Sequence, residues 1–180
     1  MRSFFLLALL LATAAHTHAQ SVARRVALGA TVSAPVGSMA DAYDVGVGGR
    51  ATLDLRPSSA FGWQIGVEAT RFGGRERRFG STPFRDGLSL GATVSARLRL
   101  QAGPTTVHAL GGVGAFRERA GDHAPYAVVP EVHVGAGLAV AAGNVEIVPE
   151  VGLQVVLSDL LSGSEYAPSI RVPVTVGVRF

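Results

Sequence analysis

The sequence predicts an all-β protein, an eight-stranded antiparallel up-and-down transmembrane β-barrel. Three observations predict it. Apolar and polar residues alternate with a period of two in eight segments, long and short links alternate between those segments, and the mean hydropathy is +0.34 although no long apolar run follows the amino-terminal region. Period-two alternation gives a strand one apolar and one polar face. Without a further apolar run of about 20 residues, the chain is not a helical membrane protein.

Residues 1–19 have the features of a secretory signal peptide. Arg2 supplies a positive charge, Phe4–Ala15 form a short apolar run, and Thr17-His18-Ala19 form a small-x-small cleavage site. The run is shorter than the ~20 residues of a membrane-spanning helix. We therefore expect residues 20–180 to form the exported barrel domain. With no cysteine and a formal charge of only +3, this domain has no disulfides and no nucleic-acid partner is indicated.

The eight alternating segments set the expected strand count. Each is about 10 to 13 residues long, which suits a tilted strand that crosses a bilayer. The fifth is the weakest, because Leu110 falls out of phase with Val107, Ala109 and Val113. No segment shows a stripe of helical period, so we expect no helix after the signal peptide. In chain order the expected strands are Arg24–Ala34, Asp44–Leu55, Ala60–Phe72, Gly87–Leu100, Thr105–Phe116, Val129–Ala141, Val145–Leu157 and Ser169–Phe180.

The links between these strands alternate strictly between long and short. The short ones are Arg56–Ser59, Gln101–Pro104 and Ala142–Asn144, and the long ones are Pro35–Tyr43, Gly73–Asp86, Arg117–Val128 and Ser158–Pro168. Short turns on one side and long loops on the other are typical of bacterial outer-membrane barrels, with the turns in the periplasm. An even number of strands then leaves both termini on the periplasmic side.

Together these features resemble the small eight-stranded outer-membrane barrels of the OmpA/OmpX-like group. The resemblance implies an integral outer-membrane protein that is monomeric and whose partners are outer-membrane lipid and lipopolysaccharide. It also implies that the closing alternation of Val174, Val176, Val178 and Phe180 serves as the signal read by the barrel-assembly machinery. Interfacial aromatic residues are expected near the periplasm (Phe61, Trp63, Phe180) and near the outer side (Tyr43, Phe72, Tyr166). Pro149 and Pro173 each remove a ladder donor inside a strand, which predicts a local defect or a bulge.

The polar faces of the strands predict an internal ion-pair network. An eight-stranded barrel is narrow enough to be filled by side chains, and paired buried charges avoid the cost of isolated ones. We expect Arg50 to lie diagonal to Glu68, and Glu146 to lie level with Arg179. The Gly-rich polar face leaves a conducting or ligand-binding lumen as an alternative. Alternation alone does not say which face points inward, so a soluble barrel with an apolar interior is another alternative. The expected network residues are Arg50, Glu68, Arg97, Arg99, Glu131, Glu146, Glu150, Arg171 and Arg179.

The second long link is rich in arginine, which binds phosphate groups in a bidentate manner. Its position at the outer end predicts contact with lipopolysaccharide phosphates, which the link at 117–128 could join through Arg117 and Arg119. The alternative is an ordinary solvated loop. The expected contact residues are Arg75, Arg77, Arg78 and Arg85.

The sequence indicates no catalytic residue, no metal site and no cofactor. His108 and His133 face inward without a third ligand at the same height, and the His-x-Ser pattern of outer-membrane deacylases is absent from residues 20–180. We therefore expect a non-enzymatic barrel with a structural or surface-interaction role. The alternatives are a narrow pore, and a lipid A-modifying enzyme that uses His123 with Ser158, Ser162 or Ser164.

Overall fold

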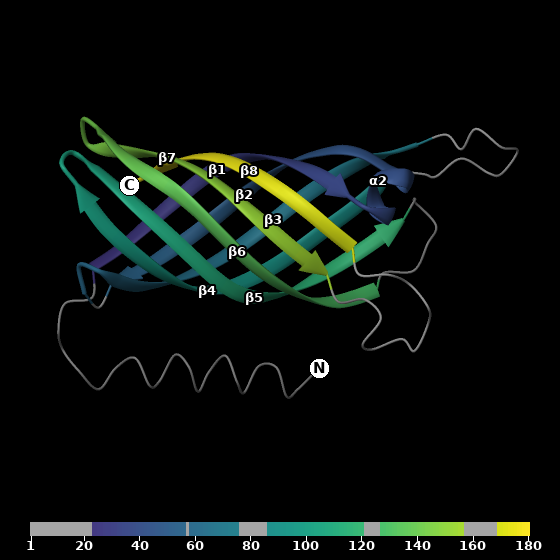
Figure 1. Cartoon of the computed structure of the whole chain (residues 1–180), viewed down its shortest axis with the longest axis horizontal. Coiled ribbons are helices and arrows are strands. Elements are labelled where there is room, and N and C mark those ends of the chain that lie inside the picture. Colours follow the sequence, from purple (N-terminus) through teal and green to yellow (C-terminus); the bar gives the residue numbers. More distant parts are fainter. Residues whose placement is uncertain (1–22, 57, 76–85, 121–126, 157–168) are drawn as a thin grey trace, which may run out of the picture.

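The computed structural model describes residues 23–56, 58–75, 86–120, 127–156 and 169–180, and within them eight antiparallel strands close into one barrel (Figure 1). The strand ends that the long links join lie at one end of the barrel, and the strand ends that the short links join lie at the other. The strands are β1 (Ala23–Val36), β2 (Tyr43–Arg56), β3 (Phe61–Gly74), β4 (Gly87–Ala102), β5 (Thr105–Ala120), β6 (Ala127–Ala142), β7 (Val145–Val156) and β8 (Ser169–Arg179).

The barrel closes because the first strand pairs with the last. The β1–β8 ladder runs from Ala27 opposite Arg179 to Val36 opposite Ile170, so neither strand is left as an open edge. Beyond the ladder, the Phe180 N–H donates to the Val26 carbonyl oxygen at 2.9 Å. In a hydrocarbon environment every backbone group needs a partner within the protein, and a closed sheet supplies it. The expected up-and-down transmembrane barrel is thus confirmed.

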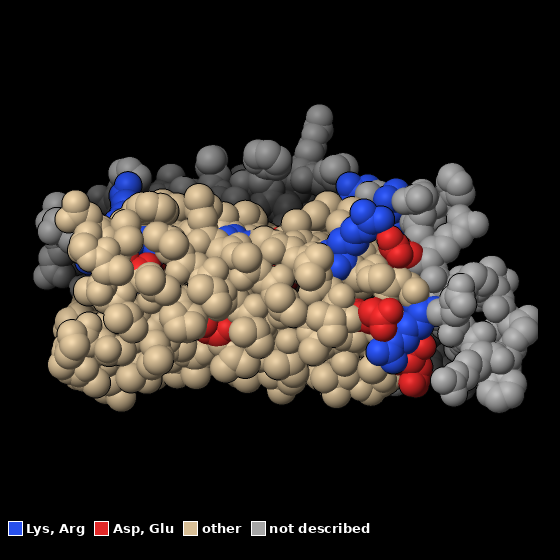
Figure 2. All heavy atoms as spheres, turned by 90° about the horizontal axis from the view of Figure 1, so that it is seen from above, with Lys and Arg blue, Asp and Glu red and all other residues tan. Residues whose placement is uncertain are grey.

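The apolar stripes face outward and the charged residues face inward. Leu100 is 73% exposed on the outer surface, whereas Arg97, three residues away on the same strand and on its lumen-facing parity, is 1% exposed. Figure 2 shows the result: the middle of the barrel wall is almost wholly free of charged atoms, which gather toward its two ends. This orientation suits lipid, and it rules out the alternative of a soluble barrel with an apolar interior.

The short turns match the sequence, but the first long link does not. Gly103 and Gly143 open the β4–β5 and β6–β7 turns with φ of 61° and 64°, a conformation that favours glycine. The first long link, expected to be non-helical, contains the five-residue helix α2 (Ser38–Ala42). So short a helix is too brief to leave a helical stripe in the sequence. No helix in the described part of the chain is long and apolar enough to cross a membrane.

Three large apolar side chains point into the lumen. Phe72, Leu110 and Phe116 are at most 7% exposed. Leu110 faces inward in a regular strand, and this explains why it falls out of phase with the outward-facing Val107 and Val113. The expected place of Phe72 among the interfacial aromatics is wrong, since it shares the inward parity of Gln64 and not the outward parity of Trp63. Trp63 does face outward and packs edge-on against Phe61, whereas Tyr166 lies outside the described residues.

The two prolines interrupt the ladder without shifting it. Pairing of β6 with β7 resumes in the same register on either side of Pro149, and pairing of β7 with β8 does so on either side of Pro173. Each proline is thus a local defect and not a bulge. In the described ladders the register shifts at one place, between Tyr43 and Gly46 where β2 meets β3.

Candidate functional site

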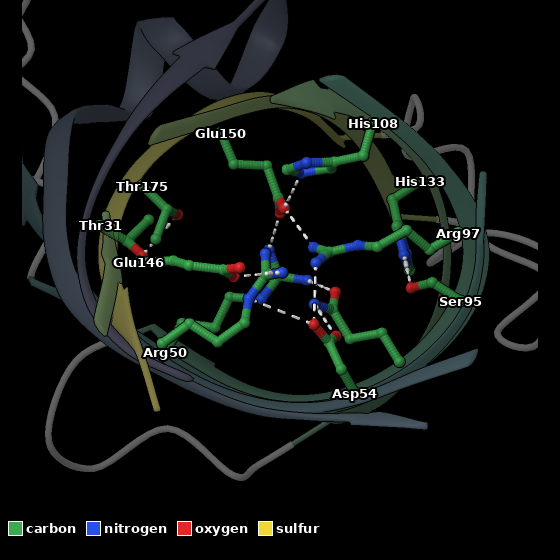
Figure 3. A network of polar contacts seen from close by, with 12 residues as sticks. Thr31, Arg50, Asp54, Ser95, Arg97, His108, His133, Glu146, Glu150 and Thr175 are labelled. Carbon is green, nitrogen blue, oxygen red and sulfur yellow. Dashed lines mark hydrogen bonds and ion pairs between the residues drawn. The ribbon is translucent and has the colours of Figure 1, made fainter. Parts of the chain in front are cut away.

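Glu150 of β7 lies at the centre of the polar network that fills the lumen (Figure 3). Its carboxylate accepts hydrogen bonds from Arg50 of β2 at 2.5 Å and from Arg97 of β4 at 2.6 Å. The Nε2 atom of His108, on β5, lies 3.0 Å from the same carboxylate. These partners come from strands on different sides of the barrel, so one carboxylate ties its walls together across the lumen.

Asp54 forms a second node, nearer the short turns. Its carboxylate accepts hydrogen bonds from Arg97 Nη1 at 3.1 Å and from Gln64 Nε2 at 3.0 Å, and Arg179 Nε lies 3.3 Å away. Gln64 also accepts a hydrogen bond from Arg50 at 3.0 Å. Because Arg97 and Arg50 also contact Glu150, the two carboxylates, the two guanidiniums and the amide form a closed circuit. Polar groups in a low-dielectric interior stabilise a fold only when they are paired in this way.

A third group of charges lies at the mouth of the lumen beside the short turns, the end expected to face the periplasm. Glu146 lies 3.1 Å from Arg179 on the adjacent strand and 2.5 Å from Arg25, with Arg56 at 3.8 Å. The register places Glu146 directly opposite Arg179, as the alternation of the two strands predicts.

The expected pairing of Arg50 with Glu68 is wrong. The two residues are directly opposite in the β2–β3 register and not diagonal, and the Arg50 side chain crosses the lumen to Glu150 instead. Glu68 accepts a hydrogen bond from Thr70 at 3.1 Å. Within the described residues, Glu68 and Arg99 take part in no ion pair, so these two members of the expected network stand outside it.

An apolar plug closes the lumen toward the outer loops. Phe116, Val129 and Val156 form a buried cluster, and the Arg171 guanidinium lies over the Phe116 ring at 4.7 Å. Arg171 also donates to Ser89 at 3.0 Å and lies 3.3 Å from Glu118. Sequence reasoning placed Arg171 in the lumen but missed the plug, although the inward parity of Phe116 was a signal for it.

Between the plug and the central node, Ser95, His133 and Glu131 lie in a row. Ser95 Oγ is 2.7 Å from His133 Nε2, and His133 Nδ1 is 3.0 Å from Glu131 Oε1. A nucleophile, a base and an orienting carboxylate follow the same order in serine hydrolases. Here Ser95 is only 1% exposed and faces the filled lumen, so no lipid ester has access to it. The row instead gives the buried Glu131 a polar neighbour. The loop residues of the enzyme alternative, His123 and the three serines, lie outside the described residues.

The lumen has no room for a passage in the part of the chain that the structure describes. The two cavities beside Glu150 measure about 30 Å³ and about 20 Å³, enough for one or two water molecules. A further hollow of about 550 Å³ opens on the wall of β1 to β4, beside the outward-facing Val67 and Leu90. The inward glycines do not widen the lumen, because large side chains occupy the space above them. A Cβ at Gly91 would lie 2.3 Å from the Phe116 ring, and one at Gly137 would lie 2.7 Å from His108 Nε2. The Gly-rich lumen is therefore filled.

The outer rim carries arginines on the lipid-facing surface. Arg71 of β3 and Arg119 of β5 both lie opposite Leu88 of β4, and Arg117 lies opposite Leu90 one step closer to the membrane centre. Arg71 contacts Asp86 at 2.6 Å. The hydrogen bonds from Arg71 and from the Gly74 N–H hold the pKa of Asp86 below its ordinary value. The Arg71–Asp86 ion pair therefore persists at a pH where a free aspartate is already protonated, and it is lost only when the pH falls to the lowered pKa.

Of the four arginines expected to contact lipopolysaccharide, only Arg75 lies in the described residues. It is engaged within the protein, where it contacts Asp44 at 2.6 Å and donates to the Ala40 carbonyl oxygen at 2.8 Å. These contacts fasten the segment around α2 to β3. Arg77, Arg78 and Arg85 lie outside the described residues. No group of three His, Cys, Asp or Glu side chains in the described residues is placed to hold a metal ion.

No protein-family model and no curated protein matches this sequence. Solved structures match it in fold. Neisserial surface protein A (NspA) superposes with a TM-score of 0.60 at 18% identity, over 87% of this chain and 95% of that one. Ail, the attachment invasion locus protein of Yersinia pestis, in complex with the heparin analogue sucrose octasulfate, gives 0.54 at 16% identity, over 87% and 97%. The outer membrane enzyme PagL gives 0.55 at 16% identity, over 86% and 98%.

At these identities the likeness concerns the fold, and both an enzyme and an attachment protein share that fold. The resemblance to small outer-membrane barrels that the sequence indicates is confirmed at this level. This chain has the closed eight-stranded barrel fold of small bacterial outer-membrane proteins.

Proposed function

We propose that this protein is a non-enzymatic integral barrel of the bacterial outer membrane. In this proposal it is exported by its signal peptide, inserted by the barrel-assembly machinery and acts as a monomer that supports the envelope and contacts lipopolysaccharide at its outer rim. The observation that carries the proposal is the filled lumen, which leaves the outer surface and the rim as the places where a partner has access. The side chain of Phe180 is 62% exposed on the outer surface, which is consistent with recognition during assembly.

Lipopolysaccharide is the partner that the chemistry of the outer rim favours. Arg71, Arg117 and Arg119 share the outward parity of their strands and lie just beyond the apolar band on neighbouring strands. The phosphate groups of the outer leaflet lie at this level. Guanidinium groups bind phosphate through two hydrogen bonds at once. Arg75 contacts Asp44 and Arg71 contacts Asp86, so a phosphate at either position shares the guanidinium with a carboxylate of the protein.

Replacing Arg71, Arg117 and Arg119 together by glutamine is expected to weaken lipopolysaccharide binding about tenfold, since three rim charges contribute about 0.5 kcal/mol each. The measurement is binding of the detergent-solubilised barrel to immobilised lipopolysaccharide at two salt concentrations. Arg24→Gln is the matched control. Arg24 is an exposed arginine on the outward-facing side of β1, at the end of the barrel opposite the rim. Equal binding by the triple variant and the control would reject the rim as the contact.

The filled lumen predicts electrical silence. The purified barrel in a planar bilayer is expected to show no discrete conductance steps, because the apolar plug and the network around Glu150 fill the lumen, and the cavities beside Glu150 measure about 30 Å³ and about 20 Å³. A known porin in the same bilayer verifies that steps are detectable. Regular steps that change in size with Arg50→Ala would show that ions pass through the lumen and would favour the pore alternative.

A further inference from the structure

The periplasmic mouth of the lumen holds more positive than negative charge. Four guanidiniums, those of Arg25, Arg56, Arg99 and Arg179, share this layer with two carboxylates, Asp54 and Glu146. Asp54 is in addition contacted by Arg97 of the central layer. Among the described residues, the ion pairs in this layer therefore leave positive charge uncompensated.

Arg99 is the group that lacks a partner. It is 6% exposed, and none of its three guanidinium nitrogens has a hydrogen-bond acceptor in the described residues. Its side chain lies over Gly62, where a Cβ would be 2.7 Å from Nη2 and 2.7 Å from the Leu55 carbonyl oxygen. The missing side chain at Gly62 thus makes the space that holds the guanidinium. A buried charge without an acceptor is costly, so this placement needs a stabilising contact.

Arg56 is the second incompletely paired arginine. Its Nη2 atom lies 4.0 Å from Asp54 and 3.8 Å from Glu146, and neither its Nε nor its Nη2 makes a hydrogen bond within the described residues. The charges of Arg56 and Arg99 are close enough to repel one another. One anion between the two guanidiniums would offset this repulsion and give acceptors to the nitrogens of Arg99 and Arg56 that lack a hydrogen bond within the described residues.

The mouth is open to such an anion from the periplasmic side. Arg25 and Arg56 retain 39% and 19% of their side-chain exposure, whereas Arg99 and Arg179 behind them are buried. Arg56 ends β2 and Arg99 lies near the end of β4, next to the short turns. This is the level at which the headgroups of the periplasmic leaflet meet the barrel.

We propose that Arg56 and Arg99, supported by Arg25 and Arg179, form a binding site for a phosphate group at the periplasmic mouth of the barrel. A phosphate offers several acceptor oxygens and can therefore receive two guanidiniums at once, each in a bidentate manner. The same chemistry suits a phospholipid headgroup of the inner leaflet or a free phosphate from the periplasm. The site lies at the opposite end from the lipopolysaccharide rim and does not depend on it.

The test measures thermal unfolding of the refolded barrel, in a phosphorus-free maltoside detergent, from the loss of its heat-modifiable band. Inorganic phosphate is expected to raise the unfolding temperature of the unaltered protein in a saturable manner, whereas chloride at equal ionic strength is not. Arg99→Gln is expected to weaken the apparent affinity at least tenfold, and Arg71→Gln, at the outer rim, is expected to leave it unchanged. If Arg99→Gln does not refold, Arg56→Gln is the second variant, because it keeps Arg99 in place. It is expected to weaken the apparent affinity for phosphate as well.

A second arm separates the two sources of phosphate. The barrel is placed in nanodiscs of phosphatidylglycerol or of a phosphorus-free glycolipid. If a lipid headgroup fills the site, phosphatidylglycerol stabilises the unaltered protein relative to the glycolipid and free phosphate adds nothing further. If free phosphate fills it, added phosphate stabilises the protein in both nanodiscs. Stabilisation of the same size in Arg99→Gln, or none by phosphate or phosphatidylglycerol in the unaltered protein, would overturn the proposal.

Discussion

Replacing Glu150 by glutamine is expected to lower the free energy of unfolding by about 3 to 5 kcal/mol, the cost of removing one partner from a buried ion pair. Glu150 neutralises Arg50 and Arg97 and lies against His108, and Arg97 is only 1% exposed. Glutamine keeps the shape but removes the negative charge. Arg97 then retains only Asp54, which it shares with Arg179. The measurement is urea-induced unfolding from lipid vesicles.

Asp86→Asn is the matched control for this variant. It removes one negative charge from an arginine pair as well, but both partners in the Arg71–Asp86 pair are largely exposed to solvent. Exposed pairs contribute little, so the unfolding midpoint is expected to stay where it is. A second variant, in which Glu150 is replaced by leucine and both Arg50 and Arg97 by methionine, is expected to recover most of the loss, since apolar replacement of a whole buried ion cluster is often neutral. A midpoint for Glu150→Gln equal to that of Asp86→Asn would show that the network does not stabilise the barrel.

Replacing Phe116 by alanine is expected to cost about 3 to 5 kcal/mol, the usual effect of removing a buried aromatic ring. The ring is 1% exposed, packs with Val129 and Val156, and lies beneath the Arg171 guanidinium. Its loss also empties the space above Gly91, so the wall cannot collapse to fill the cavity. The same unfolding experiment measures the effect.

The control for the plug is Val113→Ala on the same strand. Val113 faces outward and is 61% exposed, so its truncation removes a contact with lipid and leaves the lumen filled. A much smaller loss of stability is expected. If Phe116→Ala were as stable as Val113→Ala, the aromatic plug would be dispensable and the barrel would rest on its ladders and ion pairs alone.

Much of the barrel could be predicted from local patterns. Alternation in segments such as Ser169–Phe180 and Gly87–Leu100 depends only on the two-residue period of a strand, so strand positions and the two faces follow from the sequence. Neighbouring strands joined by tight turns have a register set by the turn. The last two strands are joined by a long link, and the level of Glu146 with Arg179 was predicted instead from their positions near the short-turn ends of those strands.

Other features could not be predicted because they depend on contacts across the lumen. Arg50 lies opposite Glu68 on the next strand, yet its guanidinium reaches Glu150, which lies 100 residues away in the sequence. The length of an arginine side chain and the narrowness of the barrel decide this choice, and neither is visible in a list of neighbouring residues. The place of Phe116 in the plug is of the same kind, since it needs Val129 and Val156 from two other strands.

By itself, the sequence determined that the chain forms eight alternating strands, that the charged residues in the middle of these strands share one face, and that long and short links alternate. The tertiary structure alone decided which charges meet, that lumen glycines such as Gly91 and Gly137 lie beneath large side chains instead of opening a passage, and that Arg99 has no acceptor among the described residues. The physical reason is that periodicity is a property of one strand. Pairing, filling and surplus charge are properties of the closed barrel, in which residues from distant strands share a narrow interior.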